Sequence, residues 1–442
     1  MADPKTSPPP ATASTGYKAP TSNPALRMMG LPNLPKKLPS RNWMIFWTLT
    51  GSLTAAIVYD KREKKRATAR WAKAVSHLAK APIASPNEMP RKLTIFLESP
   101  PADGLRVAQD HYTEYIKPVL AASGLDWEFV QGRKEGDVRA AVAERIRRAR
   151  DPRAAAAAGA TTLDEVVDEV RRRNGTPEYR GIRGDIVIGR HTWKEYVRGL
   201  HEGWLGPLTA PVVAEPTTEG TPKEGAAEGE EKKEKPEETK PEEKQPERPP
   251  QPPPYNTTND YPTSSIPMLI PAEFSPSVPV QFPHILGFTN TFIRLGRFLN
   301  RRRLADDIGR EVAAVCLATA REYREETNPD STDSEPEQAT ALAWEEKNWP
   351  KSIWKEAKKD SDDEKENLPS TPAEKIWTSS VVLDPRISMR MRRFELSPED
   401  EIRARAIVVP EEEVEGFIKG SLRSLWRWAV TPSPKPQPVW VE

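Results

Sequence analysis

The sequence predicts an α/β fold that begins with one N-terminal transmembrane helix and ends in a β-rich C-terminal part, with disordered insertions. From Lys92 onward, short apolar strands alternate with helical segments, which is typical of a mostly parallel sheet. An uncharged run near the N-terminus is long enough to span a bilayer. The 47 prolines among 442 residues and a hydrophobic share of 36% confine any apolar core to certain segments.

The chain is expected to start with a disordered Pro-rich arm, residues 1–41. Asp3 is its only acidic residue, whereas basic residues are spread along it. This composition resembles a mitochondrial targeting sequence, although the frequent prolines would prevent the amphipathic helix of a cleavable one.

Residues 42–59 carry no charge and form the predicted transmembrane helix. Trp43 and Tyr59 mark its two ends, where aromatic side chains meet the membrane interface. The alternative is a buried helix of a soluble protein, which would not need the basic flanks found on both sides. Small side chains gather near one helical face, where they would admit another membrane helix or simply face lipid. These candidate helix-packing residues are Thr48, Gly51, Ser52, Ala55 and Ala56.

Residues 60–90 are predicted to form a basic juxtamembrane helix. Its lysines and arginines would attract anionic headgroups, or would only mark the membrane edge. This flank is more basic than the N-terminal one, so the charge rule alone places the following domain in the matrix.

Low-complexity sequence divides the α/β domain. Its first part, residues 91–210, has predicted strands at 92–98, 126–130 and 185–188 and predicted helices at 105–122, 137–150, 161–173 and 192–203. A Pro/Glu/Lys linker, residues 211–260, cannot form a core and is expected to be disordered. The second part, residues 261–324, has predicted helices at 288–299 and 304–323.

The C-terminal part begins after a disordered insertion expected at 325–340. It covers residues 341–430 and is predicted to be β-rich, with strands at 376–383 and 402–409. It ends in an amphipathic helix from about Val414, which would pack on the domain or lie on a membrane or a partner. Residues 431–442 form a tail.

The sequence contains no familiar pattern for catalysis, cofactor binding or metal binding. It lacks a P-loop, a GxGxxG turn after a strand, an HExxH pair and a GxSxG elbow, and its five histidines lack metal-ligand spacing. The single cysteine, Cys316, excludes an internal disulfide, and its apolar helical surroundings predict burial. A net charge of +1 argues against a nucleic-acid partner. We therefore expect no catalytic residue, no metal site and no cofactor.

Three segments resemble the fungal fifty-four-kilodalton subunit of the mitochondrial inner-membrane carrier translocase: Ser40–Trp43 with the run that follows, Gly184–Leu208, and Phe282–Phe288. The family implies a non-catalytic, single-pass subunit of the machine that inserts polytopic carrier proteins. It implies a domain in the intermembrane space, against the charge rule, and we follow the family. It also implies three partners, namely a channel-forming multi-spanning subunit, small intermembrane-space chaperones and the membrane, with anionic lipid as a further candidate.

The segment Gly184–Leu208 is long and specific, and its large side chains are candidates for contacts with partners. A purely structural role in the domain is equally open. The candidate interaction residues are Arg190, His191, Trp193 and Trp204.

The order of strands and helices from residue 93 to 150 resembles the catalytic domain of diacylglycerol kinases. Those kinases carry a GGDGT phosphate loop after the strand that matches Asp185–Ile188, whereas this chain has Gly189-Arg190-His191-Thr192. The resemblance implies a degenerate, pseudokinase-like fold reused as a scaffold, because bulky side chains prevent the close backbone approach that glycine permits. Two alternatives are a membrane-anchored mitochondrial lipid kinase and a tether whose linker and C-terminal helix recruit a partner.

Overall fold

The structure is a computed structural model that describes residues 40–82, 87, 89–151, 163–176, 179, 181–209, 252–285, 287–327, 334–347, 349 and 374–430. The predicted arm up to residue 39, most of the linker and the tail from residue 431 lie outside the described residues. The chain divides into two units, residues 1–57 and residues 58–442.

In the first unit the structure describes the beginning of α2, a helix that runs from Arg41 to Val75. The large apolar side chains from Trp43 to Leu53 are exposed. Hydroxyl groups in this stretch donate to carbonyl oxygens three or four residues earlier, so each is satisfied within the helix; they belong to Thr48, Thr50, Ser52 and Thr54. In the described part of the chain, no helix has both the length and the apolar character needed to cross a membrane. The transmembrane helix predicted at 42–59 is therefore not confirmed.

The second unit is built on a six-stranded sheet with the strand order β2-β1-β3-β4-β8-β5. Its strands are β1 (Lys92–Glu98), β2 (Asp126–Gly132), β3 (Asp185–Ile188), β4 (Ser277–Val280), β5 (Ala320–Glu322) and β8 (Arg392–Phe394). All pairs are parallel except β5 with β8. The chain moves from β1 to β2 on one side and then to β3 on the other, so the direction of winding reverses between β1 and β3. A separate antiparallel pair joins β6 (Glu325–Thr327) to β7 (Ser334–Pro336).

The sequence of β1, KLTIFLE, shows why both faces of the sheet are buried. Leu93, Ile95 and Leu97 enter one apolar core and Phe96 enters the other, because successive side chains of a strand point to opposite faces. Apolar residues on both faces suit a parallel strand that helices cover on each side.

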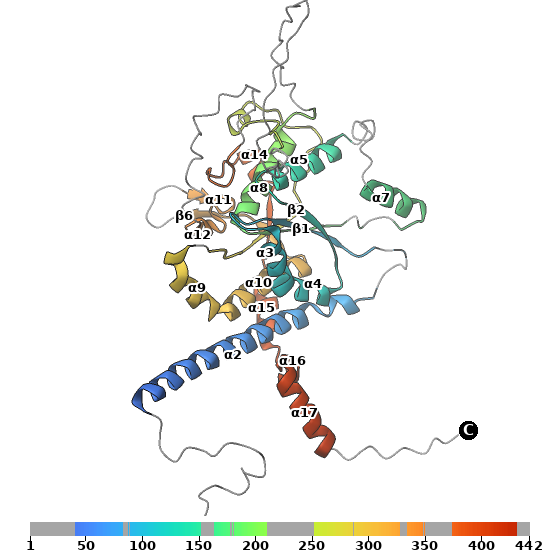
Figure 1. Ribbon diagram of the computed structural model, residues 1–442. Coiled ribbons are helices and arrows are strands. Elements are labelled where there is room, and N and C mark those ends of the chain that lie inside the picture. The colour runs from blue at the N-terminus through green and yellow to red at the C-terminus, as the bar shows by residue number, and fades with distance from the viewer. Residues whose placement is uncertain are drawn as a thin grey trace, which may run out of the picture. The chain divides into compact units, whose positions relative to one another are not determined.

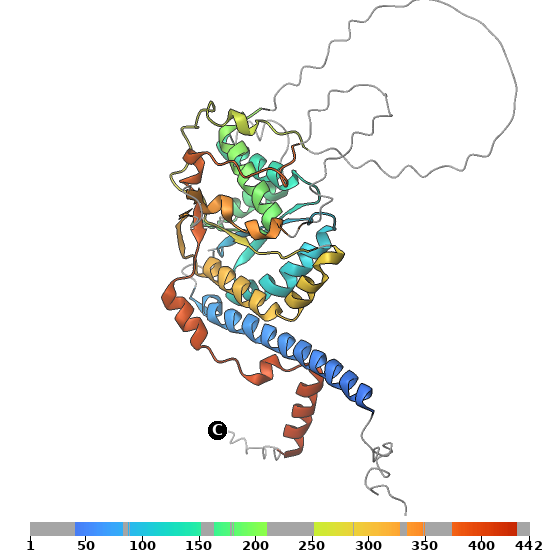
Figure 2. The same ribbon diagram turned by 90° about the vertical axis from the view of Figure 1, so that its left-hand side faces the viewer.

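Helices cover both faces of the sheet (Figure 1; Figure 2). One layer holds α3 (Leu105–His111), α4 (Lys117–Ser123), α10 (Arg301–Leu317), α15 (Pro398–Ala406) and the end of α2, with a π-helical turn at Tyr112–Ile116 between α3 and α4. The opposite layer holds α5 (Asp137–Arg150), α8 (Arg190–Leu205) and α14 (Pro385–Ser388). The result is a three-layer arrangement, which confirms the α/β class and the mostly parallel sheet that the sequence predicted for this part of the chain.

The second half of α2 is fastened to α10. The indole Nε1 of Trp71 donates to Asp306 Oδ1 at 2.7 Å, and its ring fills the space where Gly309 lacks a side chain. Nearer the middle of α2, the buried carboxylate of Asp60 accepts the backbone N–H groups of Arg301 and Arg302, both at 3.2 Å. Asp60 therefore closes the N-terminus of α10. In the range 60–90, where a basic juxtamembrane helix was predicted, α2 continues as far as Val75 and a 3-10 turn follows at Leu78–Lys80.

The prediction of a β-rich C-terminal part is wrong. Residues 376–383 contain no strand, and 402–406 belong to α15. Ser397 accepts the N–H of Asp400 and Pro398 occupies the first turn, so helix-capping signals outweigh the apolar pattern that suggested a strand. Helices dominate this part: α12 (Ala343–Glu346), α14, α15, α16 (Glu411–Val414) and α17 (Phe417–Val430), while α11 (Glu337–Thr340) directly precedes it.

Two predicted disordered regions are also partly wrong. The end of the linker, from residue 252, packs on the domain and forms a 3-10 turn at Thr258–Asp260. The insertion at 325–340 contains β6, β7 and α11 in its described residues. The remaining predicted helices appear as α7 (Leu163–Arg173) and α9 (Thr291–Phe298), beside those already described.

Candidate functional site

The reversal of winding between β1 and β3 marks the edge where open parallel sheets bind ligands, beyond the carboxyl ends of the strands. Two helices begin at this edge, α5 after β2 and α8 after β3. A helix N-terminus has unpaired N–H groups and a partial positive charge, so it readily holds a phosphate or another anion. What occupies these two N-termini decides what the site can bind.

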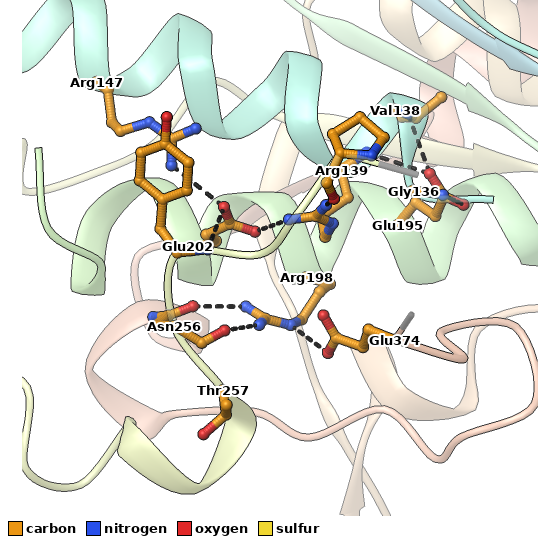
Figure 3. A network of polar contacts seen from close by, with 12 residues as sticks. Gly136, Val138, Arg139, Arg147, Glu195, Arg198, Glu202, Asn256, Thr257 and Glu374 are labelled. Atoms are coloured by element: carbon orange, nitrogen blue, oxygen red, sulfur yellow. Dashed lines mark hydrogen bonds and ion pairs between the residues drawn. The ribbon is translucent and has the colours of Figure 1, made fainter. Parts of the chain in front are cut away.

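The N-terminus of α5 is occupied by the buried carboxylate of Glu195. Its Oε1 accepts the N–H of Gly136 at 2.6 Å (Figure 3). Its Oε2 accepts the N–H groups of Val138 at 3.0 Å and Arg139 at 3.2 Å. The indole Nε1 of Trp377 adds a fourth donor at 2.9 Å from Oε1. Since Glu195 lies on α8, one of these helices closes the N-terminus of the other.

The N-terminus of α8 is occupied in the same way by Glu345, from α12. The N–H of Arg190 donates to its Oε2 at 3.0 Å, and the N–H of Phe282 donates to its Oε1 at 2.6 Å. Burial raises the pKa of Glu345 to about 8. The adjacent Glu346 pairs with the Arg190 guanidinium at 2.8 Å. Both helix N-termini at this edge are therefore filled by the protein's own acidic side chains.

A third carboxyl group, Glu98 at the end of β1, lies against Glu195. Glu98 is fully buried, and no N–H or O–H group of the described residues donates to its oxygens. Burial raises the pKa of Glu98 well above its ordinary value, and the charge of Glu195 raises it further. Burial also raises the pKa of Glu195, but hydrogen bonds to its carboxylate oppose that shift. The raised pKa of Glu98 favours its neutral form beside the Glu195 carboxylate.

Further along α8, Glu202 holds α5 and the chain that follows the linker. It pairs with Arg139 and accepts from Arg147 at 3.2 Å and from the N–H of Tyr255 at 3.2 Å (Figure 3). Arg139 also donates to the carbonyl oxygen of Pro252. The side chains of Glu202 and Arg139 are almost completely buried, and a buried pair of this kind needs such additional hydrogen bonds.

Two more side chains of α8 hold segments from elsewhere in the chain. Arg198 donates to Asn256 Oδ1 at 2.9 Å and to Glu374 Oε1 at 2.8 Å (Figure 3). His201 donates from Nδ1 to a carbonyl oxygen one turn earlier and accepts the N–H of Asp384 at Nε2, at 2.9 Å. Burial lowers the pKa of His201 to about 4, so the ring stays neutral and can accept.

The four candidate interaction residues are all buried; they are Arg190, His191, Trp193 and Trp204. Trp193 Nε1 donates to the carbonyl oxygen of Gln338 at 2.8 Å, and the Trp204 ring stacks on Phe274 with 5.5 Å between centroids. These side chains contact the chain itself. Of the two roles that the sequence left open, burial favours the structural one. The candidate helix-packing residues of α2 have no such test and remain a prediction.

The basic stretch of α2 is largely paired within the protein. Lys73 lies 2.8 Å from Glu413, and Arg62 and Arg66 pair with Glu411. Lys64 also pairs with an acidic side chain, and burial lowers its pKa to about 8. The charge predicted to meet lipid headgroups is therefore mostly turned toward acidic residues of the same chain.

The site offers little reactive chemistry. Within the described ranges, no three His, Cys, Asp or Glu side chains are placed to hold a metal ion. Cys316 is buried, as predicted, and burial raises the pKa of its thiol to about 11, which makes it a poor nucleophile.

Sequence reasoning missed the three residues that close this edge, Glu195, Glu345 and Trp377. A signal existed for the first, because Glu195, Arg198 and Glu202 share one face of a helix whose other residues are largely apolar or aromatic. No local signal marks the other two, which lie at least 140 residues away from α8 in the sequence.

Comparison with known proteins identifies the family. The family profile described as inner membrane protein import complex subunit Tim54 matches residues 23–394. A mitochondrial import inner membrane translocase subunit tim54 from Neurospora crassa is 64% identical over 424 residues, which cover 92% of this chain and 88% of the relative. The subunit of that name from Candida albicans is 33% identical over 85% of this chain and 97% of its own length. These relatives are named as translocase subunits and not as enzymes. The chain therefore belongs to the Tim54 family, whose members are subunits of the mitochondrial inner-membrane protein import complex.

Proposed function

We propose that this chain is a non-catalytic structural subunit of the inner-membrane translocase that inserts polytopic carrier proteins. Its α/β unit supports assembly of the complex and docks small chaperones in the intermembrane space. Membership of the Tim54 family supports this proposal. The observation that carries the non-catalytic part is the filling of both helix N-termini by Glu195 and Glu345. An incoming phosphate would have to displace a buried carboxyl group at either position.

The same observation opposes the lipid-kinase alternative. The positions that would form a phosphate loop carry Arg190 and His191, whose side chains are buried among residues of the C-terminal part. Isothermal titration of the purified full-length chain with Mg²⁺·ATP should give no heat of binding. Micromolar affinity, or phosphorylation of diacylglycerol by this chain, would contradict a purely structural role.

Docking and assembly are tested by purifying the complex through a tag on this chain. The proposal expects a multi-spanning channel subunit and small chaperones to co-purify, and depletion of the chain to slow carrier insertion in isolated mitochondria. Import of matrix-targeted precursors serves as the control, because a general loss of membrane potential would slow both. Normal carrier insertion after complete depletion is incompatible with the proposal.

We further propose that residues 42–59 lie in the inner membrane in contact with other helices of the complex. The paired hydroxyls of Thr48, Thr50, Ser52 and Thr54 support this, because a hydroxyl satisfied within its own helix is cheaper to bury in lipid. Small side chains would admit a neighbouring helix. Gly51→Leu should weaken co-purification of the channel, whereas Val58→Leu, which exchanges one large side chain for another, should not. Release of the protein by alkaline carbonate would contradict membrane insertion.

The side of the membrane and the role of the linker need separate tests. A protease added to mitoplasts should digest a C-terminal tag if the α/β unit lies in the intermembrane space, and should leave it intact if the unit lies in the matrix.

Deleting residues 211–251 distinguishes a scaffold from a tether. A scaffold should still assemble, because long surface segments add little to the stability of a fold, whereas a tether should fail.

A further inference from the structure

A basic and aromatic surface surrounds α9 on the second unit. We call it the α9 surface and define it by its exposed apolar residues, Phe288, Phe292, Ile293, Leu295 and Phe298, together with Arg294. The exposed fraction is 93% for Phe288 and 85% for Phe292. Figure 1 shows α9 at the edge of the layer that contains α3, α4 and α10. Clustered exposed aromatic residues of this kind mark an interaction site more often than a neutral surface.

The segment that carries this surface is basic, and the acidic side chains that line the pocket beside Arg294 come from other segments, at Asp103, Asp110 and Glu114. Residues 288–304 contain five arginines and no acidic residue. Arg294 and Arg303 are exposed, and the described residues include no hydrogen-bond or ion-pair partner for either guanidinium group. The Arg301 guanidinium lies 3.8 Å from Glu114, while Asp60 accepts the backbone N–H of the same residue. The basic stretch of α2 differs, because most of its charges are paired internally and only Lys61 and Lys65 are exposed without a partner among the described residues. Positive charge that is free to meet an anionic partner therefore gathers near α9 and at the adjoining part of α2.

The α9 surface is also joined to the end of the uncharged run. Tyr59 is the last residue of that run, and the Arg302 guanidinium lies 5.1 Å from the centre of its ring. Asp60, the next residue, closes the N-terminus of α10, which starts three residues after α9 ends. These contacts hold the α9–α10 junction beside the residues of α2 where the uncharged run ends and the charged residues begin. If the uncharged run lies in lipid, this junction lies at the level of the bilayer interface.

We propose that the α9 surface lies on the bilayer, with its phenylalanines among the headgroups and its arginines against anionic phospholipid. The proposal rests on the membrane insertion of residues 42–59 proposed above. Phenylalanine and leucine beside arginine are the side chains that interfacial helices use, since the apolar groups enter the headgroup region while the cations meet phosphate. The alternative occupant is a protein partner, which the test distinguishes.

The chain provides a convenient labelling scheme, because its single cysteine is buried. Phe292→Cys in the full-length protein, carrying an environment-sensitive fluorophore, reports the polarity at the α9 surface. Met268→Cys, at a fully exposed side chain of the same unit, is the matched control. Both labelled proteins are reconstituted in phosphatidylcholine vesicles with and without phosphatidylglycerol, and flotation measures how much protein is membrane-bound.

The proposal expects the fluorophore at position 292 to shift to the blue in vesicles that contain phosphatidylglycerol, and to be quenched by lipids spin-labelled near the headgroup. The fluorophore at position 268 should show neither change. Reversing two charges in Arg294→Glu/Arg303→Glu should remove at least half of the shift. Arg172→Glu/Arg173→Glu, an equal charge change at exposed positions of α7, should leave it intact.

The outcomes separate the two proposals. Flotation of the protein with position 292 still in water overturns the α9 proposal and leaves membrane insertion standing. Loss of flotation overturns both. A blue shift that needs the other subunits of the complex, without quenching by lipid, identifies a protein partner and also overturns the α9 proposal.

Discussion

Replacing Gly199 with alanine should destabilise the second unit, although alanine favours helices. Gly199 lies where α8 crosses α5, and a Cβ atom at this position would lie 2.7 Å from the carbonyl oxygen of Arg139 and 2.8 Å from Cβ of Val142. Both contacts are closer than a methyl group tolerates, and the first is with helix backbone. That backbone cannot retreat easily, because Glu195 binds the N-terminus of the same helix.

Two opposing contributions set how much Gly199→Ala changes the free energy of unfolding. Overpacking a well-filled contact costs about 1–3 kcal/mol, and the rigid carbonyl places Gly199→Ala in the upper half of that range. Higher helix propensity returns about 1 kcal/mol. The expected result is a net loss of about 1–2 kcal/mol.

The matched control is Gly296→Ala in α9, where a new Cβ atom would meet nothing within 4 Å. Only the contribution of helix propensity remains at this position, so the free energy of unfolding of this variant should rise by up to about 1 kcal/mol. Thermal unfolding of the full-length protein in mild detergent, followed by tryptophan fluorescence, should rank Gly296→Ala above wild type and Gly199→Ala several degrees below it. If Gly199→Ala proved as stable as Gly296→Ala, close approach of α5 and α8 would not be what requires glycine.

Three more predictions follow from α8 and the C-terminus. Arg139→Met should destabilise the protein by about 3–5 kcal/mol, because Glu202 is left as a buried charge; adding Glu202→Leu should restore part of the loss in denaturant unfolding. Between about pH 6.5 and 4 the unfolded His201 binds a proton while the folded ring does not, so stability should fall as pH falls through this window, and His201→Gln should flatten the dependence in urea titrations at several pH values. Truncation after Glu415 should weaken assembly measured by co-purification but leave the unfolding temperature unchanged, because α17 exposes side chains such as Leu422.

Local patterns were enough to predict the centre of the sheet. The limits of β1, α5 and β3 match the predicted ranges at 92–98, 137–150 and 185–188, because each combines an apolar periodicity with a clear boundary. β4 was missed because it is four residues long and contains Pro279, which normally argues against a central strand. The strand forms because neighbouring strands of the sheet pair with it. Pairing between segments that are distant in the sequence cannot be predicted from the sequence of β4 alone.

Only the location of the candidate site could be predicted from the sequence. The residues after the third strand pointed to the edge of the sheet, whereas the lost phosphate loop that the kinase resemblance implied stays a prediction. Their burial was not predictable, because it depends on chain that returns from residue 338 onward. A side chain as polar as Arg190 would normally be exposed, and its guanidinium is buried here because Glu346 and the carbonyl oxygen of Ala341 pair with it.

The two flanks of the linker are fastened to the same pair of helices. Before it, Arg150 of α5 binds the carbonyl oxygen of Gly206 at 2.9 Å, and after it Arg139 binds that of Pro252. A cut anywhere between these anchors should thus yield two fragments that stay associated, since the sheet and its helices are contributed by both. The protein would then run as two bands on a denaturing gel yet elute as one species, which makes the linker a natural place for a cleavable split or for a fused reporter.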